Sequence, residues 1–99
     1  MNRTREEILN LIEENRSAIR AAGARRLALF GSAARGEARQ ESDVDFVVEM
    51  EHKTFDSYMD LKELLEELLG CRVDLVMMDA IKPRLRASIE REMVHAPGL

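Results

Sequence analysis

The sequence has 99 residues, 45% of them hydrophobic and 34% charged, a composition typical of one globular domain spanning residues 1–99. Its net charge of -4 argues against sequence-independent nucleic-acid binding, which requires many cations to neutralise phosphates. Cys71 is the single cysteine, so an internal disulfide is excluded. The apolar runs are far shorter than the roughly 20 residues of a membrane span, and no secretory signal is seen. We therefore expect a cytoplasmic protein without membrane contact.

The first element is predicted to be an amphipathic helix over residues 4–22. Thr4 and Glu7 have the spacing of a capping box, in which the two side chains satisfy free backbone N–H groups at a helix start. Apolar residues then recur at helical spacing, and Gly23 is typical of a helix stop.

Two strands separated by a polar segment are expected next. Residues 26–30 form a short apolar run that ends at Gly31 and indicates a buried strand. Residues 32–42 are small, polar and charged, so we expect a single helical turn followed by a loop. Residues 43–49 alternate at their start and are rich in β-branched side chains, which predicts a second strand.

The second half of the chain predicts helix, strand and helix. A leucine-rich stripe predicts a helix that begins between residues 54 and 57 and ends at Gly70, and residues 72–78 form a third strand. Pro83 is typical of the first turn of a last helix. Three apolar residues of that helix are spaced at four: Leu85, Ile89 and Met93.

These elements predict an α/β (α+β) fold with a three-stranded mixed sheet flanked by helices, in the order α-β-α(turn)-β-α-β-α. The second and third strands enclose a long helix, so they should be parallel through a right-handed crossover. The first two strands are joined by a loop and should be antiparallel. The second strand would then direct Val44, Phe46 and Val48 to the core.

Acidic residues stand where apolar ones are expected. Asp43 and Asp45 would project from the other face of the second strand, about 7 Å apart. Two carboxylates this close repel unless a cation lies between them, and Mg²⁺ prefers such oxygen ligands. Asp74, at the start of the neighbouring strand, could add a third carboxylate. The alternative is that these aspartates are solvated turn or capping residues.

A glycine-containing turn precedes the acidic pair. From Gly31 to Gly36 the backbone could approach a ligand closely, and its N–H groups with the Ser32 hydroxyl could bind an anion. This turn is not a P-loop, because Glu37 and Ala38 stand where that motif requires Lys and Ser or Thr. The alternative is an ordinary turn between a strand and a helix.

Other residues invite simpler interpretations. The two histidines, His52 and His95, have no zinc-site pattern and are expected at the surface. Cys71 is expected to be a small buried hydrophobe. Four methionines fall inside predicted elements and are expected to pack in the core: Met59, Met77, Met78 and Met93.

Taken together, the run GSAARGEARQESDVDFVV at residues 31–48 resembles the minimal nucleotidyltransferase (MNT) branch of the polymerase-beta-like nucleotidyltransferase superfamily. The usual form of that motif is GSxARGxAxxxSDxDL, and Phe46 replaces its leucine. The resemblance extends from the leading helix to the VDLV segment at residues 73–76 and the helix after Pro83.

The resemblance implies a role for several residues. Gly31 and Ser32 would hold the triphosphate of ATP, with Arg35 as the nearest cation and Arg39 as a weaker candidate. The resemblance implies that two Mg²⁺ ions are bound by Asp43, Asp45 and Asp74. Asp74 would also act as general base.

The resemblance also implies a partner. Similar proteins are antitoxins encoded beside a HEPN-domain toxin, whose tyrosine they modify with AMP. A chain of 99 residues has no room for a separate acceptor-binding domain, so we expect a partner chain or an oligomer. Two other functions stay open: a non-catalytic module that neutralises its partner by contact, and nucleotidyl transfer to a small molecule.

Overall fold

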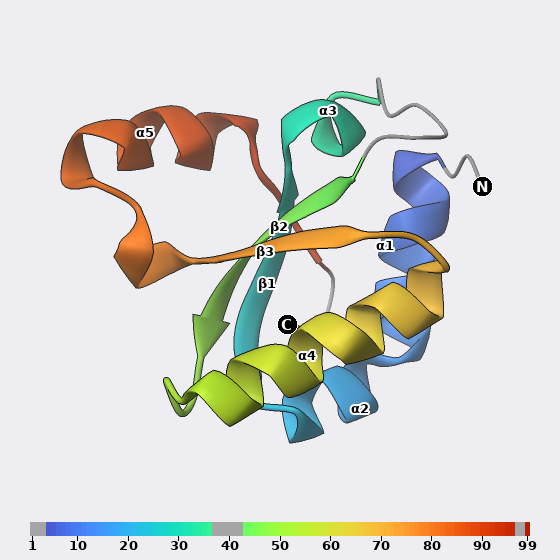
Figure 1. The fold of residues 1–99 in the computed structure, drawn as a ribbon. Helices are drawn as coiled ribbons and strands as arrows, with labels where there is room; N and C mark the ends of the chain where they lie inside the picture. The colour runs from blue at the N-terminus through green and yellow to red at the C-terminus, as the bar shows by residue number, and fades with distance from the viewer. Residues whose placement is uncertain (1–3, 37–42, 97–98) are drawn as a thin grey trace.

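The computed structural model describes residues 4–36, 43–96 and 99 (Figure 1). The elements in chain order are α1 (Arg5–Glu14), α2 (Arg16–Ala21), β1 (Ala24–Phe30), α3 (Gly31–Ala34), β2 (Val44–Met50), α4 (Phe55–Leu69), β3 (Val73–Met77), the 3-10 turn η1 (Met78–Ala80), α5 (Pro83–Glu92) and β4 (Val94–His95).

The strands form one mixed sheet in the order β3-β2-β1-β4. As predicted, β2 and β3 are parallel and β1 and β2 are antiparallel. The described sheet has four strands, so the prediction of three was wrong by one edge strand. That strand, β4, has only two residues, which are too few to show an alternating pattern, and it pairs with Ala28 and Leu29 of β1.

One face of the sheet packs against α1, α2 and α4 to form the core. Fully buried side chains come from every layer: Ile8, Ile12, Ile19, Leu27, Leu29, Phe46, Leu61, Leu65 and Leu69. The predicted core face of β2 is confirmed, because Val44, Phe46 and Val48 are all buried there. Val47 is buried as well, but strand alternation places it on the opposite face.

The predicted first helix is divided in two. Its start is confirmed, since the Thr4 hydroxyl accepts a hydrogen bond from the Glu7 backbone N–H at 3.1 Å. The prediction of one continuous helix was wrong, because Asn15 leaves the helical conformation at φ -112° and ψ 17°. Its side-chain Nδ2 donates to the Leu11 carbonyl at 2.8 Å, and this local bond competes with continuation of the helix.

The last two helices differ in how deeply they are buried. α4 starts and stops as predicted, with Thr54 as N-cap and Gly70 in the left-handed conformation at φ 67°. α5 begins at Pro83 as predicted, but none of its residues is buried and Leu85 is 47% exposed. Figure 1 shows the reason: α5 lies across the sheet from α4, away from the core. Within the described ranges, no helix is both long and apolar enough to cross a bilayer.

This difference in burial predicts unequal responses to the same substitution. Leu61→Ala should lower the free energy of unfolding by about 2–5 kcal/mol, because it leaves a cavity in the core. Leu85→Ala on exposed α5 should change it by no more than about 0.5 kcal/mol. Urea denaturation of both variants checks this, and equal losses would contradict the assignment of the core face.

Candidate active site

Two of the predicted acidic residues are neighbours across β2 and β3. The parallel register pairs Asp45 with Asp74 directly, between the buried pairs on either side. Because Val44 and Phe46 point to the core, strand alternation directs Asp45 to the open face of the sheet. Asp43 lies just before β2 and is exposed. The predicted meeting of Asp45 and Asp74 is therefore confirmed by the sheet register.

This neighbourhood changes the acidity of one carboxyl group. Burial, the largest cause, acts together with the negative charge and hydrogen bonding of Asp74 to raise the pKa of Asp45 from its ordinary value of 3.8 to about 6. Asp43 also raises the pKa of Asp45, whereas the positive charge of Arg35 lowers it. A carboxylate in this position would be stabilised by a bound cation.

The glycine turn packs directly on this carboxylate. Gly31 has φ 73°, a left-handed conformation that other residues rarely adopt. A Cβ added at Gly31 would contact Oδ2 of Asp45 and lie 3.3 Å from its Cγ. The sequence predicted that this glycine permits a close approach to a ligand, and the structure shows that it also permits a close approach to Asp45.

Two long-range contacts hold the segment after Gly31. Nη1 of Arg5, in the first turn of α1, donates to the carbonyl of buried Ala34 at 3.1 Å. Nη1 of Arg35 lies 3.6 Å from Oε2 of Glu92 at the end of α5. Sequence reasoning missed Arg5 and Glu92, because no local pattern relates residues so far apart in the chain.

The remaining predicted residues are placed as follows. Ser32 lies within α3, and Arg35 follows that turn with an exposed side chain. Arg39 lies outside the described residues. Phe30 was not predicted as a site residue, yet it pairs directly across from Asp45 and shares its face. The alternation of β1, in which Leu27 and Leu29 point to the core, would have indicated that Phe30 lies on the open face.

Asp43 and Asp74, but not Asp45, border a polar cavity beside the start of β3. This cavity of about 280 Å³ is lined by Asp43 and Asp74 together with the cations Lys62 and Arg72. Among residues 4–36, 43–96 and 99, no three His, Cys, Asp or Glu side chains converge on one ion position. The donor chemistry nevertheless suits Mg²⁺, since Asp45 and Asp74 offer adjacent carboxylate oxygens with an unfavourable like-charge interaction to relieve.

Comparisons with known proteins give a consistent result. The family model described as "Nucleotidyltransferase domain" matches residues 7–95. The chain is 39% identical over 94 residues to protein adenylyltransferase MntA of Thermococcus cleftensis, which covers 93% of this chain and 95% of that protein.

Solved structures share the fold. A protein described as a minimal nucleotidyltransferase is 42% identical to this chain, and the two structures superpose with a TM-score of 0.72. The aligned region covers 87% of this chain and 93% of that one. A chain in the complex of a tri-AMPylated HEPN toxin of Shewanella oneidensis with an MNT antitoxin has a TM-score of 0.63 at 20% identity, covering 92% of this chain and 73% of that one. At that identity the second likeness shows the fold alone.

The contact between Gly31 and Asp45 predicts a difference between two matched glycine variants. Gly31→Ala and Gly36→Ala both place a side chain at φ 73°, which destabilises each by about 1–3 kcal/mol. Gly31→Ala should be the more destabilising, because no heavy atom lies within 4 Å of a Cβ at Gly36. Urea denaturation measures both, and the difference should shrink in an Asp45→Ala background. Equal losses at both glycines would contradict the contact.

The raised pKa of Asp45 predicts a pH-dependent gain in stability. Because its pKa is higher in the folded protein, its ionisation opposes folding, and this penalty appears as pH rises through about 6. Asp45→Asn should therefore stabilise the protein by about 1 kcal/mol near pH 8, allowing for solvent screening of a partly exposed group. The gain should vanish below about pH 4. Thermal unfolding across this range checks it, and a gain independent of pH would refute the electrostatic explanation.

Proposed function

The chain belongs to the nucleotidyltransferase domain family, and from that premise we propose that it transfers AMP from ATP to an acceptor hydroxyl in a Mg²⁺-dependent reaction. The observation that carries the proposal is the meeting of Asp45 with Asp74 beneath the Gly31 turn. Paired carboxylates beside an anion-binding turn are what transfer of a nucleotidyl group requires.

Each site residue has a distinct proposed part. Asp43, Asp45 and Asp74 would hold two Mg²⁺ ions, which when bound offset the negative charge that develops on the phosphates. The backbone at Gly31 and Ser32 would bind the triphosphate, and Arg35 would add a positive charge beside it. In this arrangement the ion pair of Arg35 with Glu92 must yield to the nucleotide.

The reaction is a single displacement at phosphorus. The acceptor oxygen forms a bond to the α-phosphorus, and the bond from that phosphorus to the pyrophosphate oxygen breaks with its electron pair. Asp74 is proposed to accept the proton of the acceptor hydroxyl, because it lies exposed beside Asp45 at the edge of the sheet.

The proposed acceptor is a tyrosine of a HEPN-domain toxin encoded nearby, with this chain as the antitoxin. The support is the likeness to protein adenylyltransferase MntA, together with the fold shared with a chain of the tri-AMPylated HEPN toxin complex. In this proposal the partner chain supplies the surface that presents the acceptor.

Intact mass spectrometry tests the proposal. The protein, ATP, Mg²⁺ and the neighbouring HEPN protein are incubated together, and the HEPN protein should gain mass in increments of one AMP. Asp43→Asn and Asp74→Asn should each reduce the transfer by at least about a hundredfold, because each removes a proposed metal ligand. Glu51→Gln, at an exposed position beyond the opposite end of β2 from Asp45, should leave it unchanged.

Two results would contradict the proposal. Absence of any AMP increment, with a tight complex that survives Asp43→Asn, would indicate a module that neutralises its partner by contact. Transfer only to added small hydroxyl compounds would indicate a different acceptor class.

A further inference from the structure

We infer that Arg5 is a positioning residue of the proposed reaction: by bonding the end of α3, it holds the proposed phosphate-binding turn in the conformation that binds the triphosphate. The inference rests on the proposed function, because it assumes that the triphosphate binds at Gly31 and Ser32. It extends the site to the first turn of α1, which lies outside the motif at residues 31–48.

The turn α3 is too short to maintain its own conformation. It has four residues, and a single helical turn fixes several dihedral angles in return for one hydrogen bond. That bond runs from the Arg35 backbone N–H to the Gly31 carbonyl at 3.3 Å, longer than the usual value of about 2.9–3.0 Å. The orientation of α3 therefore depends on contacts from other elements.

Arg5 supplies one of these contacts. Its Nη1 donates to the carbonyl of Ala34, 29 residues further along the chain, at 3.1 Å. The last carbonyls of a helix have no partner within the helix, so the guanidinium satisfies a group that α3 leaves open. A hydrogen bond from a charged donor is also stronger than one between neutral groups. Figure 1 shows the start of α1 beside α3, as this bond requires.

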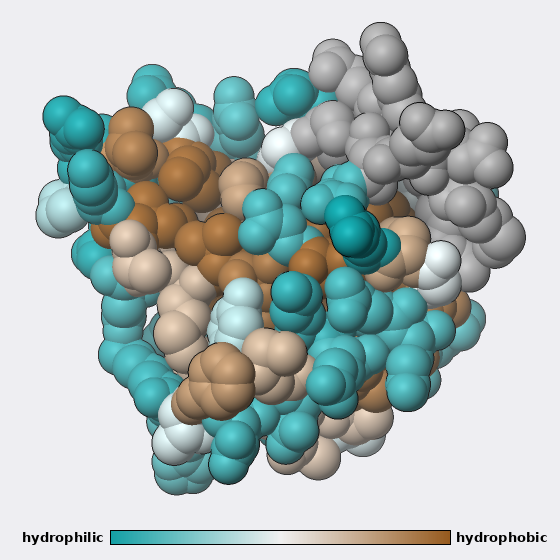
Figure 2. Space-filling view, viewed as in Figure 1, coloured by the Kyte–Doolittle hydropathy of each residue, from teal (hydrophilic) through white to brown (hydrophobic). Residues whose placement is uncertain are grey.

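An arginine at the surface is by itself ordinary in this chain. Charged residues make up 34% of the sequence, and hydrophilic side chains cover much of the surface over α4 (Figure 2). Arg5 differs because its partner is a backbone carbonyl of Ala34, which is only 3% exposed. Its contact therefore joins the surface of α1 to the buried side of the turn.

The guanidinium of Arg5 is itself held in place. Thr4 caps α1 at the preceding residue and accepts from the Glu7 backbone N–H at 3.1 Å, which fixes the backbone where Arg5 begins the helix. Nη2 of Arg5 donates to Oε1 of Glu6 at 3.3 Å. The two ends of the planar guanidinium thus have different partners, and one orientation satisfies both.

The bond leaves the start of α3 open for the nucleotide. In a helical turn the carbonyl groups point toward its end and the N–H groups toward its start. Arg5 bonds at the end, whereas the proposed phosphate contacts are the backbone N–H groups of Gly31 and Ser32. Arg5 therefore acts through α3 and does not have to move when the triphosphate binds.

Binding of inorganic tripolyphosphate tests this role, because this ligand has the phosphates without the nucleoside. In calorimetry with Mg²⁺, Arg5→Met should bind tripolyphosphate and ATP at least about tenfold more weakly, since a displaced turn misplaces its phosphate contacts. The factor should be equal at about 0.1 M and about 0.5 M salt, because salt screens the effect of a lost charge but does not restore the turn.

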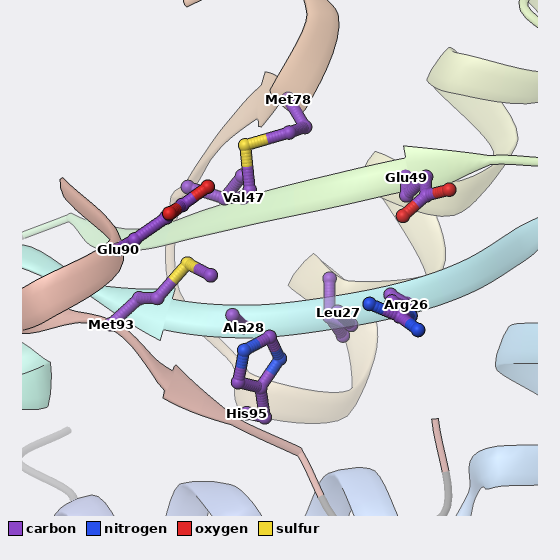
Figure 3. A pocket seen from close by; sticks show the side chains of 9 residues that line it. All are labelled: Arg26, Leu27, Ala28, Val47, Glu49, Met78, Glu90, Met93 and His95. Carbon is purple, nitrogen blue, oxygen red and sulfur yellow. The ribbon is translucent and has the colours of Figure 1, made fainter. Parts of the chain in front are cut away.

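Two variants are matched controls, and neither should change the affinity for tripolyphosphate. Ile8→Val shortens a buried side chain of α1 and lowers stability without removing the bond to Ala34. Arg26→Met removes an exposed arginine from the end of β1 remote from α3, beside a pocket of about 340 Å³ on the open face (Figure 3). Met78 and Met93 line the same pocket and are half-buried, so the expectation that they pack in the core was wrong.

Backbone amide exchange measures the turn without any ligand. The amide of Arg35 closes α3, so it should exchange at least about fivefold faster in Arg5→Met and at the unmodified rate in Arg26→Met. Arg5→Lys is a milder variant that keeps the charge but lacks the planar fork joining Ala34 to Glu6. Its affinity for tripolyphosphate should fall about threefold. Circular dichroism confirms that each variant is folded before affinities are compared.

The outcomes distinguish this inference from the function on which it rests. Unchanged tripolyphosphate affinity in folded Arg5→Met, or in Arg5→Lys should Arg5→Met not fold, would overturn the positioning role alone. An equal loss in Ile8→Val would reduce it to stability, and a loss that disappears at the higher salt would reduce it to charge. Failure of the unmodified protein to bind ATP and tripolyphosphate would overturn the proposed function, and the inference with it.

Discussion

Asp45 and Asp74 lie side by side because β2 and β3 run parallel in a register that pairs them residue for residue. Partial burial, together with the negative charge of Asp74, raises the pKa of Asp45 to about 6, so the folded chain holds this carboxylate in a position that disfavours its charge. Much of the surrounding structure depends on this pair. Gly31 must lack a side chain because Asp45 occupies the space beside it, and the turn that follows lies over the carboxylates. A carboxyl group whose pKa is raised by burial and by a specific charged neighbour is typical of a functional site.

The two faces of the sheet differ in what covers them and in their proposed roles. One face is closed by α1, α2 and α4, whose buried side chains supply the stability of a small domain. The other face carries Asp45, Val47 and Glu49 in succession and is covered only in part, by α5. Arg5 and Glu92 connect the two parts, since one reaches from α1 to Ala34 and the other from α5 to Arg35. The proposed phosphate-binding turn is thus held from both sides of the sheet.

The sequence predicted what short-range patterns encode. Capping residues located the starts of α1 and α4, alternation located β2 and its core face, and the motif brought Gly31 and Asp45 into one hypothesis. It could not predict the break at Asn15, where the backbone leaves the helical conformation, or the two-residue β4. Nor could it predict how little of α5 is buried, because the spacing of Leu85, Ile89 and Met93 does not show whether another element covers them.

The central proposal is that Asp45 and its neighbours bind a cation that offsets the repulsion between their carboxylates. It is tested most directly by following the Asp45 carboxyl carbon by NMR through a pH titration, with and without Mg²⁺. Without the ion, Asp45 should titrate with a pKa of about 6, and saturating Mg²⁺ should lower that pKa by at least about one unit. An Asp45 that titrates near its ordinary value of 3.8 and is unaffected by Mg²⁺ would contradict the account.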